Sequence, residues 1–173
     1  MSLLIQQNTL IDVNLFPHQE VVFAGACLSM SEETLLLVNF DDQKKGFDGF
    51  TIFRSEQVHN YREWTETDRR EILLHNLSDF SELLPLSYFQ DWEGALWAAG
   101  ETGPIAFFTG GQTSNYFVGQ LIHIEDGIAQ FQLIKPSGQA SVSIQIPLAE
   151  IDFFSFYTHY ERRLQTAMQQ GTV

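Results

Sequence analysis

The sequence lacks most of the features by which an enzyme or a metal protein is recognised. It has one cysteine, Cys27, so no disulfide can form within the chain. Cys27 lies in an apolar run, where the expected role of a cysteine is that of a small core residue. There is no Gly-x-Ser-x-Gly elbow, phosphate-binding loop, dinucleotide fingerprint or Cys/His cluster. We therefore expect no catalytic residue, no metal ion and no cofactor.

Positive charge is also scarce. The chain has 9 Lys or Arg against 22 Asp or Glu, which gives a formal net charge of −13. Binding to nucleic-acid phosphates or to an anionic membrane surface needs clusters of basic residues. The only adjacent basic pairs are at 44–45, 69–70 and 162–163. The charge balance disfavours nucleic acid and membranes as partners and favours a basic protein, or serves solubility alone.

Long apolar runs are missing as well. No window approaches the roughly 18 apolar residues of a membrane-spanning helix. The first 13 residues, MSLLIQQNTLIDV, lack the basic region and cleavage site of a signal peptide, so we expect a cytoplasmic protein. Aromatic residues are plentiful, with 15 Phe, and apolar residues make up 44% of the chain. This composition favours a folded core over disorder.

Two parts of the chain share one pattern. Residues 10–28 and 104–122 align at a constant offset of 94, which matches Ile11 with Ile105 and Gly25 with Gly119. Residues 52–61 and 145–154 align at an offset of 93, which matches Val58 with Ile151. Order and spacing are preserved more than identity, and repeats of this length indicate two related units rather than a solenoid.

Each copy is a series of short predicted strands. Residues 128–134 alternate strictly between apolar and polar, as a half-buried strand requires, and 140–147 alternate again. Asp126-Gly127 and the run 135–138 are turn sequences. A small barrel suits such short strands, because closure removes the exposed edges.

Residues 63–103 differ from both copies and predict a helical insert. One helix is expected at 65–77, and a second begins near Ser87, with Gln90 in capping-box register, and ends at Gly100. The side of the second helix expected to be buried carries Phe89, Trp92, Ala95, Leu96 and Ala99. The insert holds 9 acids and 2 bases, so it is the most acidic part of the chain.

The sequence contains two short runs rich in phenylalanine, at 46–50 and 153–157. In GFDGF, residues 46–50, we expect a turn in which Asp48 accepts backbone hydrogen bonds and Phe47 and Phe50 anchor the turn on the core. In FFSFY, residues 153–157, Phe153 and Tyr157 should face one way and Phe154 and Phe156 the other. One small barrel cannot bury both faces of that strand. We favour packing between the copies and the insert over an oligomer interface.

The order FAG…SEETLLLVNFD…GFDGFTIFRSEQV resembles the Sm-like and SH3-like small β-barrels, in particular uncharacterised bacterial proteins with this pattern. The second copy, YFVGQLIHIEDGIAQFQLIKPSGQ with the preceding YFQDWEGALWAAGE, resembles the same pattern. The resemblance spans about two thirds of the chain and implies a tandem barrel fold. It does not imply one activity, since small barrels of this type bind RNA, peptides or other subunits.

The sequence thus predicts a mainly β (α+β) protein of two tandem small SH3/Sm-like β-barrels, at 1–62 and 104–173, joined by a helical insert at 63–103. We expect a non-enzymatic protein-interaction module that binds a basic protein partner through its acidic surface. The alternatives are an RNA-binding Sm-like regulator and an enzyme with a site between the barrels, and a homo-oligomer is compatible with each. The candidate binding residues are Glu66, Asp68, Glu71, Asp79, Glu82, Phe47 and Asp48.

Overall fold

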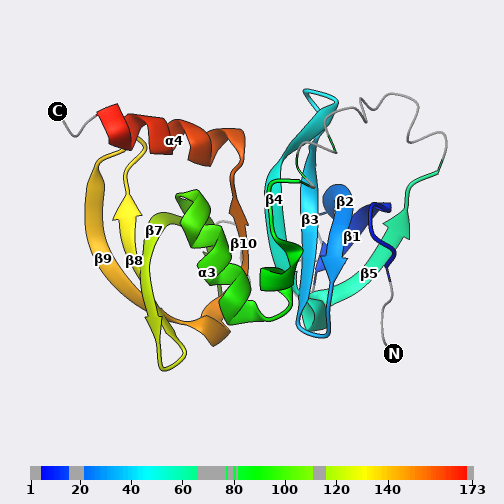
Figure 1. Ribbon diagram of the computed structural model, residues 1–173, viewed down its shortest axis with the longest axis horizontal. Coiled ribbons are helices and arrows are strands. Elements are labelled where there is room, and N and C mark those ends of the chain that lie inside the picture. The colour runs from blue at the N-terminus through cyan, green and yellow to red at the C-terminus, as the bar shows by residue number, and fades with distance from the viewer. Residues whose placement is uncertain are drawn as a thin grey trace.

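The computed structural model describes residues 5–15, 22–65, 77, 80, 82–110 and 116–170, and within these ranges the protein is mainly β. Its strands form one antiparallel sheet in the order β5-β1-β2-β3-β4-β10-β6-β7-β8-β9 (Figure 1). The strands are β1 Leu10–Leu15, β2 Val22–Met30, β3 Thr34–Asp41, β4 Gly46–Arg54, β5 Val58–Glu63, β6 Ile105–Thr109, β7 Tyr116–Glu125, β8 Ile128–Ile134, β9 Ala140–Pro147 and β10 Ile151–Phe156.

Two α-helices have described bounds and accompany the sheet. Helix α3, Trp92–Thr102, contacts β7 and β10, and Figure 1 shows it against the concave side of the second half of the sheet. Helix α4, His159–Gln170, follows β10 and crosses the upper end of the same half. No helix in the described ranges is long and apolar enough to cross a membrane. The helix expected at 65–77 lies almost entirely outside the described residues.

The two halves of the sheet have the same topology and register. Each runs fifth, first, second, third, fourth strand: β5-β1-β2-β3-β4 and β10-β6-β7-β8-β9. Ile11 lies opposite Gly25 in the first half, and Ile105 lies opposite Gly119 in the second. The alignment of these residues at an offset of 94 is therefore confirmed.

The offset of 93 is confirmed at the fifth strands. The first is entered through the 3₁₀ turn η1, Ser55–Gln57, and the second through η4, Leu148–Glu150. The residue after each turn begins the fifth strand of its half. Val58 lies opposite Leu15 at the end of β1, and Ile151 lies opposite Thr109 at the end of β6. The chain therefore repeats one local geometry in both halves of the sheet.

The halves do not close as the separate barrels expected from the sequence. Strand β10 pairs with β6 on one side and with β4 on the other, placing Phe153 opposite Phe53 and Phe156 opposite Phe50. The fifth strand of the second copy thus pairs with the fourth strand of the first copy instead of closing its own half. The result is a single open sheet in which, among the described strands, β5 and β9 form the edges.

The aromatic run of β10 packs as predicted between the copies and the insert. Phe154 meets the ring of Trp92 at 5.0 Å between centroids, and Phe156 stacks on Phe89 at 6.0 Å. Phe153 faces the other way and stacks on Phe108 at 4.2 Å. The prediction that Tyr157 shares the face of Phe153 is wrong. The strand ends at Phe156, and Tyr157 has a φ of 58°, which breaks the alternation and turns its ring toward Phe50.

Cys27 is fully buried, as the apolar run around it predicts. It belongs to the core of the first half together with Ile11, Leu37 and Phe53. Burial raises the pKa of the Cys27 thiol to about 11, since the thiolate would lose its hydration there. At neutral pH the thiol is therefore protonated and shielded, which suits a structural role rather than a nucleophile.

The buried face of the insert helix is confirmed, but its ends differ from the prediction. Trp92, Ala95, Leu96 and Ala99 are buried on α3, and Phe89 is buried just before it. Residues Leu86–Phe89 form a 3₁₀ turn, η3, so Ser87 does not cap the helix. The cap is Asp91, whose carboxylate accepts a hydrogen bond of 2.7 Å from the Gly94 N–H. The helix continues past Gly100 to Thr102.

Candidate functional site

Most of the acidic residues predicted as a binding surface lie outside the described residues: Glu66, Asp68, Glu71 and Asp79. Glu82 is described and exposed, at the start of the segment that leads into η3. The role of the insert as a recognition surface therefore stays a prediction. Residues 82–103, which the structure describes, carry four acids and no Lys or Arg.

The run GFDGF is part of β4 rather than the predicted turn, which lies at 42–45. The register between β3 and β4 shifts here. Val38 lies opposite Phe50 and Phe40 opposite Phe47, so β4 has one extra residue, as a β-bulge does. Phe47 and Phe50 are buried, as predicted.

The Asp48 side chain connects this part of β4 to the far end of the chain. Its carboxylate accepts hydrogen bonds from the Arg162 guanidinium at 2.8 Å and from the His159 N–H at 3.1 Å. It also pairs with Lys44 at 3.2 Å. His159 and Arg162 belong to α4, so Asp48 ties the first copy to the last helix. Phe47 and Asp48 thus have clear structural contacts, and their predicted role in binding is untested.

The bulge glycine beside Asp48 makes room for the start of α4. Gly49 has a φ of 69°, and a Cβ placed on it would lie 2.5 Å from the backbone nitrogen of Thr158. Thr158 in turn donates its N–H to the Glu161 carboxylate at 2.8 Å, and its hydroxyl donates to the same oxygen. This is the reciprocal part of a capping box, in which the third helical residue satisfies the residue before the helix.

Glu161 is the buried acid of this junction, with 3% of its surface exposed. Burial raises the pKa of its carboxyl, and the nearby Asp48 adds to the effect, while the hydrogen bonds from Thr158 act in the opposite direction. An acid whose pKa is raised on folding binds more protons in the folded than in the unfolded state. Its contribution to stability is therefore greatest at low pH and falls as pH rises from the unfolded pKa through the folded one.

This pKa shift predicts a pH-dependent effect of the substitution Glu161→Gln. Glutamine keeps an acceptor for Thr158 but carries no charge to desolvate. The free energy of unfolding of the variant, relative to the wild type, should therefore increase as pH rises from about 4 toward 8. Urea denaturation of both proteins at several pH values measures that difference. A difference that stays constant with pH, or that falls, would contradict the prediction.

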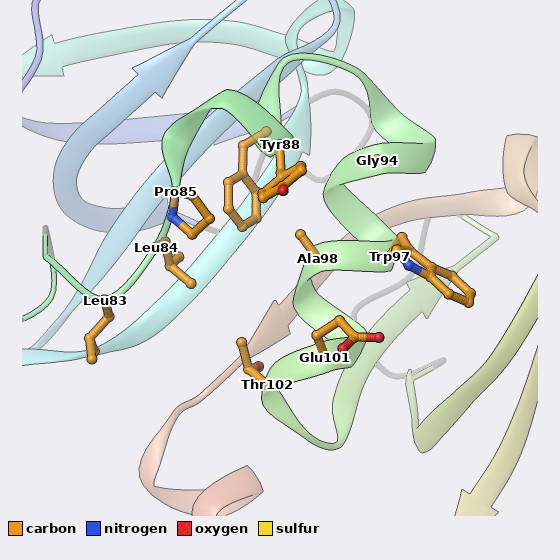
Figure 2. Close-up of a pocket in the computed structure, with 10 residues that line it drawn as sticks. Leu83, Leu84, Pro85, Tyr88, Gly94, Trp97, Ala98, Glu101 and Thr102 are labelled. Atoms are coloured by element: carbon orange, nitrogen blue, oxygen red, sulfur yellow. The ribbon is translucent and has the colours of Figure 1, made fainter.

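A largely apolar hollow lies between residues 83–89 and α3 (Figure 2). Its volume is about 480 Å³. Figure 2 shows Leu83, Leu84, Pro85 and Tyr88 on one side, with Ala98 and Thr102 of α3 facing them. We call this hollow the apolar pocket. Its size falls in the range that holds a drug-sized ligand or one or two side chains of a peptide.

Local sequence explains why the pocket exists. The buried stripe of α3 faces the sheet, so the residues between those of the stripe, Trp97, Ala98 and Glu101, lie on its other side. Pro85 is the residue before η3, and residues 83–85 line the other side of the hollow. Tyr88 and Trp97 remain 60% and 47% exposed, although aromatic rings of this size are usually well covered.

A second hollow adjoins the first across Trp97. It is lined by Trp97, Gly94 and Ile124 together with the acids Asp91 and Glu93, and has a volume of about 500 Å³. We call it the acidic hollow. An aromatic ring beside two carboxylates suits a cationic side chain, since the ring face and the acids both attract positive charge. The Trp97 side chain therefore separates two neighbouring hollows of complementary chemistry.

A third hollow lies where both copies meet the insert and has a volume of about 590 Å³. It is lined by Glu33, Arg54, Glu56, Gln57, Asp91, Trp92, Glu93, Gly127, Leu148 and Ala149. Arg54 donates to the Leu148 carbonyl at 2.6 Å and lies 4.2 Å from the centroid of the Trp92 ring. Burial lowers its pKa from the usual value, and these contacts hold the guanidinium in a structural position. The enzymatic alternative requires a polar pocket between the copies. An enzymatic function at this hollow stays a prediction.

Sequence reasoning missed the residues around Trp97. The apolar pattern of the run SYFQDWEGALWAAGE predicts the buried stripe of the helix, and Trp97 lies outside that stripe. A tryptophan on the polar side of an amphipathic helix was the available signal. No group of three or more His, Cys, Asp or Glu that could hold a metal ion occurs in the described ranges.

Comparison of the chain with protein-family models, curated proteins and solved structures gives no match.

Proposed function

We propose that this protein is a non-enzymatic interaction module that binds a segment of a partner protein across Trp97. An apolar side chain of the segment occupies the apolar pocket, and a neighbouring Lys or Arg occupies the acidic hollow. In this proposal the two halves of the sheet are copies of one Sm/SH3-like unit that serve as a scaffold. The second copy and the insert supply the binding surface.

The juxtaposition of the two hollows is the observation that carries the proposal. The apolar pocket is lined mainly by carbon, with Leu83 and Tyr88 about half exposed at its mouth. Partly exposed aromatic side chains beside a pocket are typical anchors of protein interfaces. The acids of 82–103, with no base among them, explain why the partner should be basic. The proposal therefore assigns the predicted acidic recognition surface to the acidic hollow beside Trp97.

The proposal predicts the sequences that a displayed random-peptide library should yield against the folded protein. Enriched peptides should carry an aromatic or large aliphatic residue within a few positions of Lys or Arg. Trp97→Ala and Tyr88→Ala should each weaken the binding of a synthetic enriched peptide about tenfold, or about 1.4 kcal/mol. Glu93→Lys should weaken it further at low salt, since it reverses the charge of the acidic hollow.

Tyr160→Ala is the matched control, because Tyr160 is an aromatic residue of similar exposure on α4. That variant should bind the peptide like the wild type. Affinities are measured by isothermal titration calorimetry, after circular dichroism shows that each variant is folded. Enrichment of acidic peptides, or equal binding by the Trp97→Ala and Tyr160→Ala variants, would rule out the proposed site.

A further inference from the structure

A fourth hollow lies on the sheet where β2, β3 and β4 of the first half meet β10 and β6 of the second. Its volume is about 300 Å³. None of the described residues that line it contributes to the apolar pocket or to the acidic hollow. We call it the junction hollow. The lining residues that bear on its chemistry are Phe23, Asn39, Thr51, Phe108, Phe153 and Ser155.

Three polar side chains of the junction hollow come from neighbouring strands. Thr51 of β4 lies directly opposite Ser155 of β10. On its other side Thr51 lies opposite Leu37 of β3, and Asn39 is two residues further along that strand. Residues in these positions share one face of a sheet, so their side chains are neighbours. Within the described residues, the side chains of Asn39, Thr51 and Ser155 make no hydrogen bond.

Thr51 is the residue whose state needs an explanation, because only 3% of its surface is exposed. Its hydroxyl is not among the fully enclosed polar atoms, so it opens into the hollow that the residue lines. The other buried threonine of the described residues, Thr34, donates its hydroxyl to the Phe89 carbonyl at 2.5 Å. Buried polar side chains are normally paired within the protein in this way. The Thr51 hydroxyl is therefore available to a molecule in the hollow.

The second copy carries apolar residues at the equivalent positions. The strand register places Ile144 where the first copy has Thr51, and Leu133 where it has Asn39. Both apolar residues pack against the core cluster that includes the buried face of α3. In the second half these positions therefore serve packing. The first half has the same backbone pattern but presents polar groups to a hollow, which indicates binding rather than core formation.

Phenylalanine rings from both copies stand beside these polar groups. Phe153 of β10 meets the ring of Phe23 edge-on at 5.0 Å between centroids, and it stacks on Phe108 at 4.2 Å. Phe23 and Phe108 are partly exposed. None of the described lining residues carries a charge, so a carboxylate or an ammonium group would lose its hydration there without gaining a counter-charge. Apolar walls with a few polar groups are typical of sites for small uncharged molecules.

We propose that the junction hollow binds a small, uncharged aromatic molecule that carries an amide group or an equivalent adjacent donor and acceptor. The ring of this molecule lies against Phe23 and Phe108. Its donor and acceptor pair with the Asn39 amide, which can both donate and accept, and the Thr51 hydroxyl supplies a further hydrogen bond. This site is separate from the peptide surface at Trp97 and does not depend on it.

The first test uses probes of similar size and different chemistry. Benzamide carries the proposed amide, toluene lacks a polar group, benzoate is an anion and benzylamine is a cation at neutral pH. In amide NMR titrations, benzamide should shift the signals of Gly25, Asn39 and Thr51 with a dissociation constant of about 1 mM, as suits a ligand of this size. The other three probes should bind about tenfold more weakly or less. The absence of these shifts with benzamide, or equal affinity for any other probe, would overturn the proposal.

The second test compares the two buried threonines, since valine replaces a hydroxyl with a methyl group of similar size. Thr51→Val should weaken benzamide binding about tenfold. Without ligand its urea midpoint should equal or exceed that of the wild type, because no partner in the described residues is lost. Thr34→Val is the matched control. It should bind benzamide like the wild type but unfold at a lower urea concentration, because it leaves the Phe89 carbonyl without its donor.

Two results of this comparison would contradict the proposal. One is a Thr51→Val protein that binds benzamide as tightly as the wild type. The other is an equal loss of stability in Thr51→Val and Thr34→Val, since the Thr51 hydroxyl would then have a structural role instead of a ligand-binding one.

Discussion

Replacing Gly25 with alanine should destabilise this protein strongly, by about 3 kcal/mol or more. A Cβ on Gly25 would lie 2.1 Å from the carbonyl oxygen of Val38, a backbone atom of the neighbouring strand β3. No rotation of a side chain can relieve that overlap, so β2 and β3 must separate or bend. Urea denaturation followed by circular dichroism measures the loss as a lower midpoint.

Gly119 supplies the matched control, because it occupies the equivalent place in the second copy. A Cβ on Gly119 would lie 3.0 Å from the Gln132 carbonyl oxygen and 3.3 Å from the Phe131 Cβ, which is tight but not overlapping. Gly119→Ala should therefore cost about 1 kcal/mol. If the two variants lose similar stability, the strands are not as close in the first copy as the structure places them.

Gly49→Ala should also destabilise the protein by about 3 kcal/mol, for two reasons that add. The backbone at Gly49 has a φ of 69°, a conformation that costs an L-residue about 1–2 kcal/mol. The new Cβ would in addition approach Thr158 to between 2.5 and 2.7 Å. The substitution acts at the contact between β4 and the start of α4, so α4 should lose protection from amide hydrogen exchange before the rest of the sheet.

Gly127→Ala separates the two contributions. Gly127 has a φ of 74°, close to that of Gly49, and a Cβ there meets nothing within 4 Å. This variant should show the backbone cost alone, about 1 kcal/mol. The difference between the two variants then measures the contact with Thr158. A Gly49→Ala protein as stable as the Gly127→Ala protein would mean that α4 is not seated on the bulge of β4.

The repeat was predictable because its signal is local. Alternating residues and turn pairs such as Asp126-Gly127 set each strand, and the two φ values of 50° and 74° at that pair fit the hairpin turn that the sequence predicts. The matched positions Ile11 and Ile105 lie opposite the matched glycines Gly25 and Gly119. The spacing of apolar residues was therefore enough to predict the register of these strand pairs.

The pairing of β4 with β10 was not predictable in the same way. Both strands are rich in phenylalanine, and their composition indicates burial on two faces without saying which strand lies beside which. Closure of each half and joining of the halves bury similar side chains. The choice depends on long-range geometry, including the contacts of Asp48 with α4, which are 111 and 114 residues away in sequence.

The candidate site was predictable in its chemistry more than in its place. The acidity of the insert is a property of composition, so the sequence alone establishes it. The pocket needs the relative position of η3 and α3. That position follows from where the helix begins, and Asp91 rather than Ser87 determines it. Trp97 was visible in the sequence, but its exposure depends on this one helix start.

The pairing of β4 with β10 also sets the order in which the protein can be completed. Ile52 and Phe154 lie opposite each other but are 102 residues apart in the chain. During synthesis, β4 is made long before its neighbour, and its phenylalanine-rich edge stays available until β10 emerges. Contacts of such long sequence separation form slowly, and an uncovered edge of this kind associates readily with other chains. The time needed to translate the second copy is therefore the interval in which the nascent first copy is most exposed to aggregation.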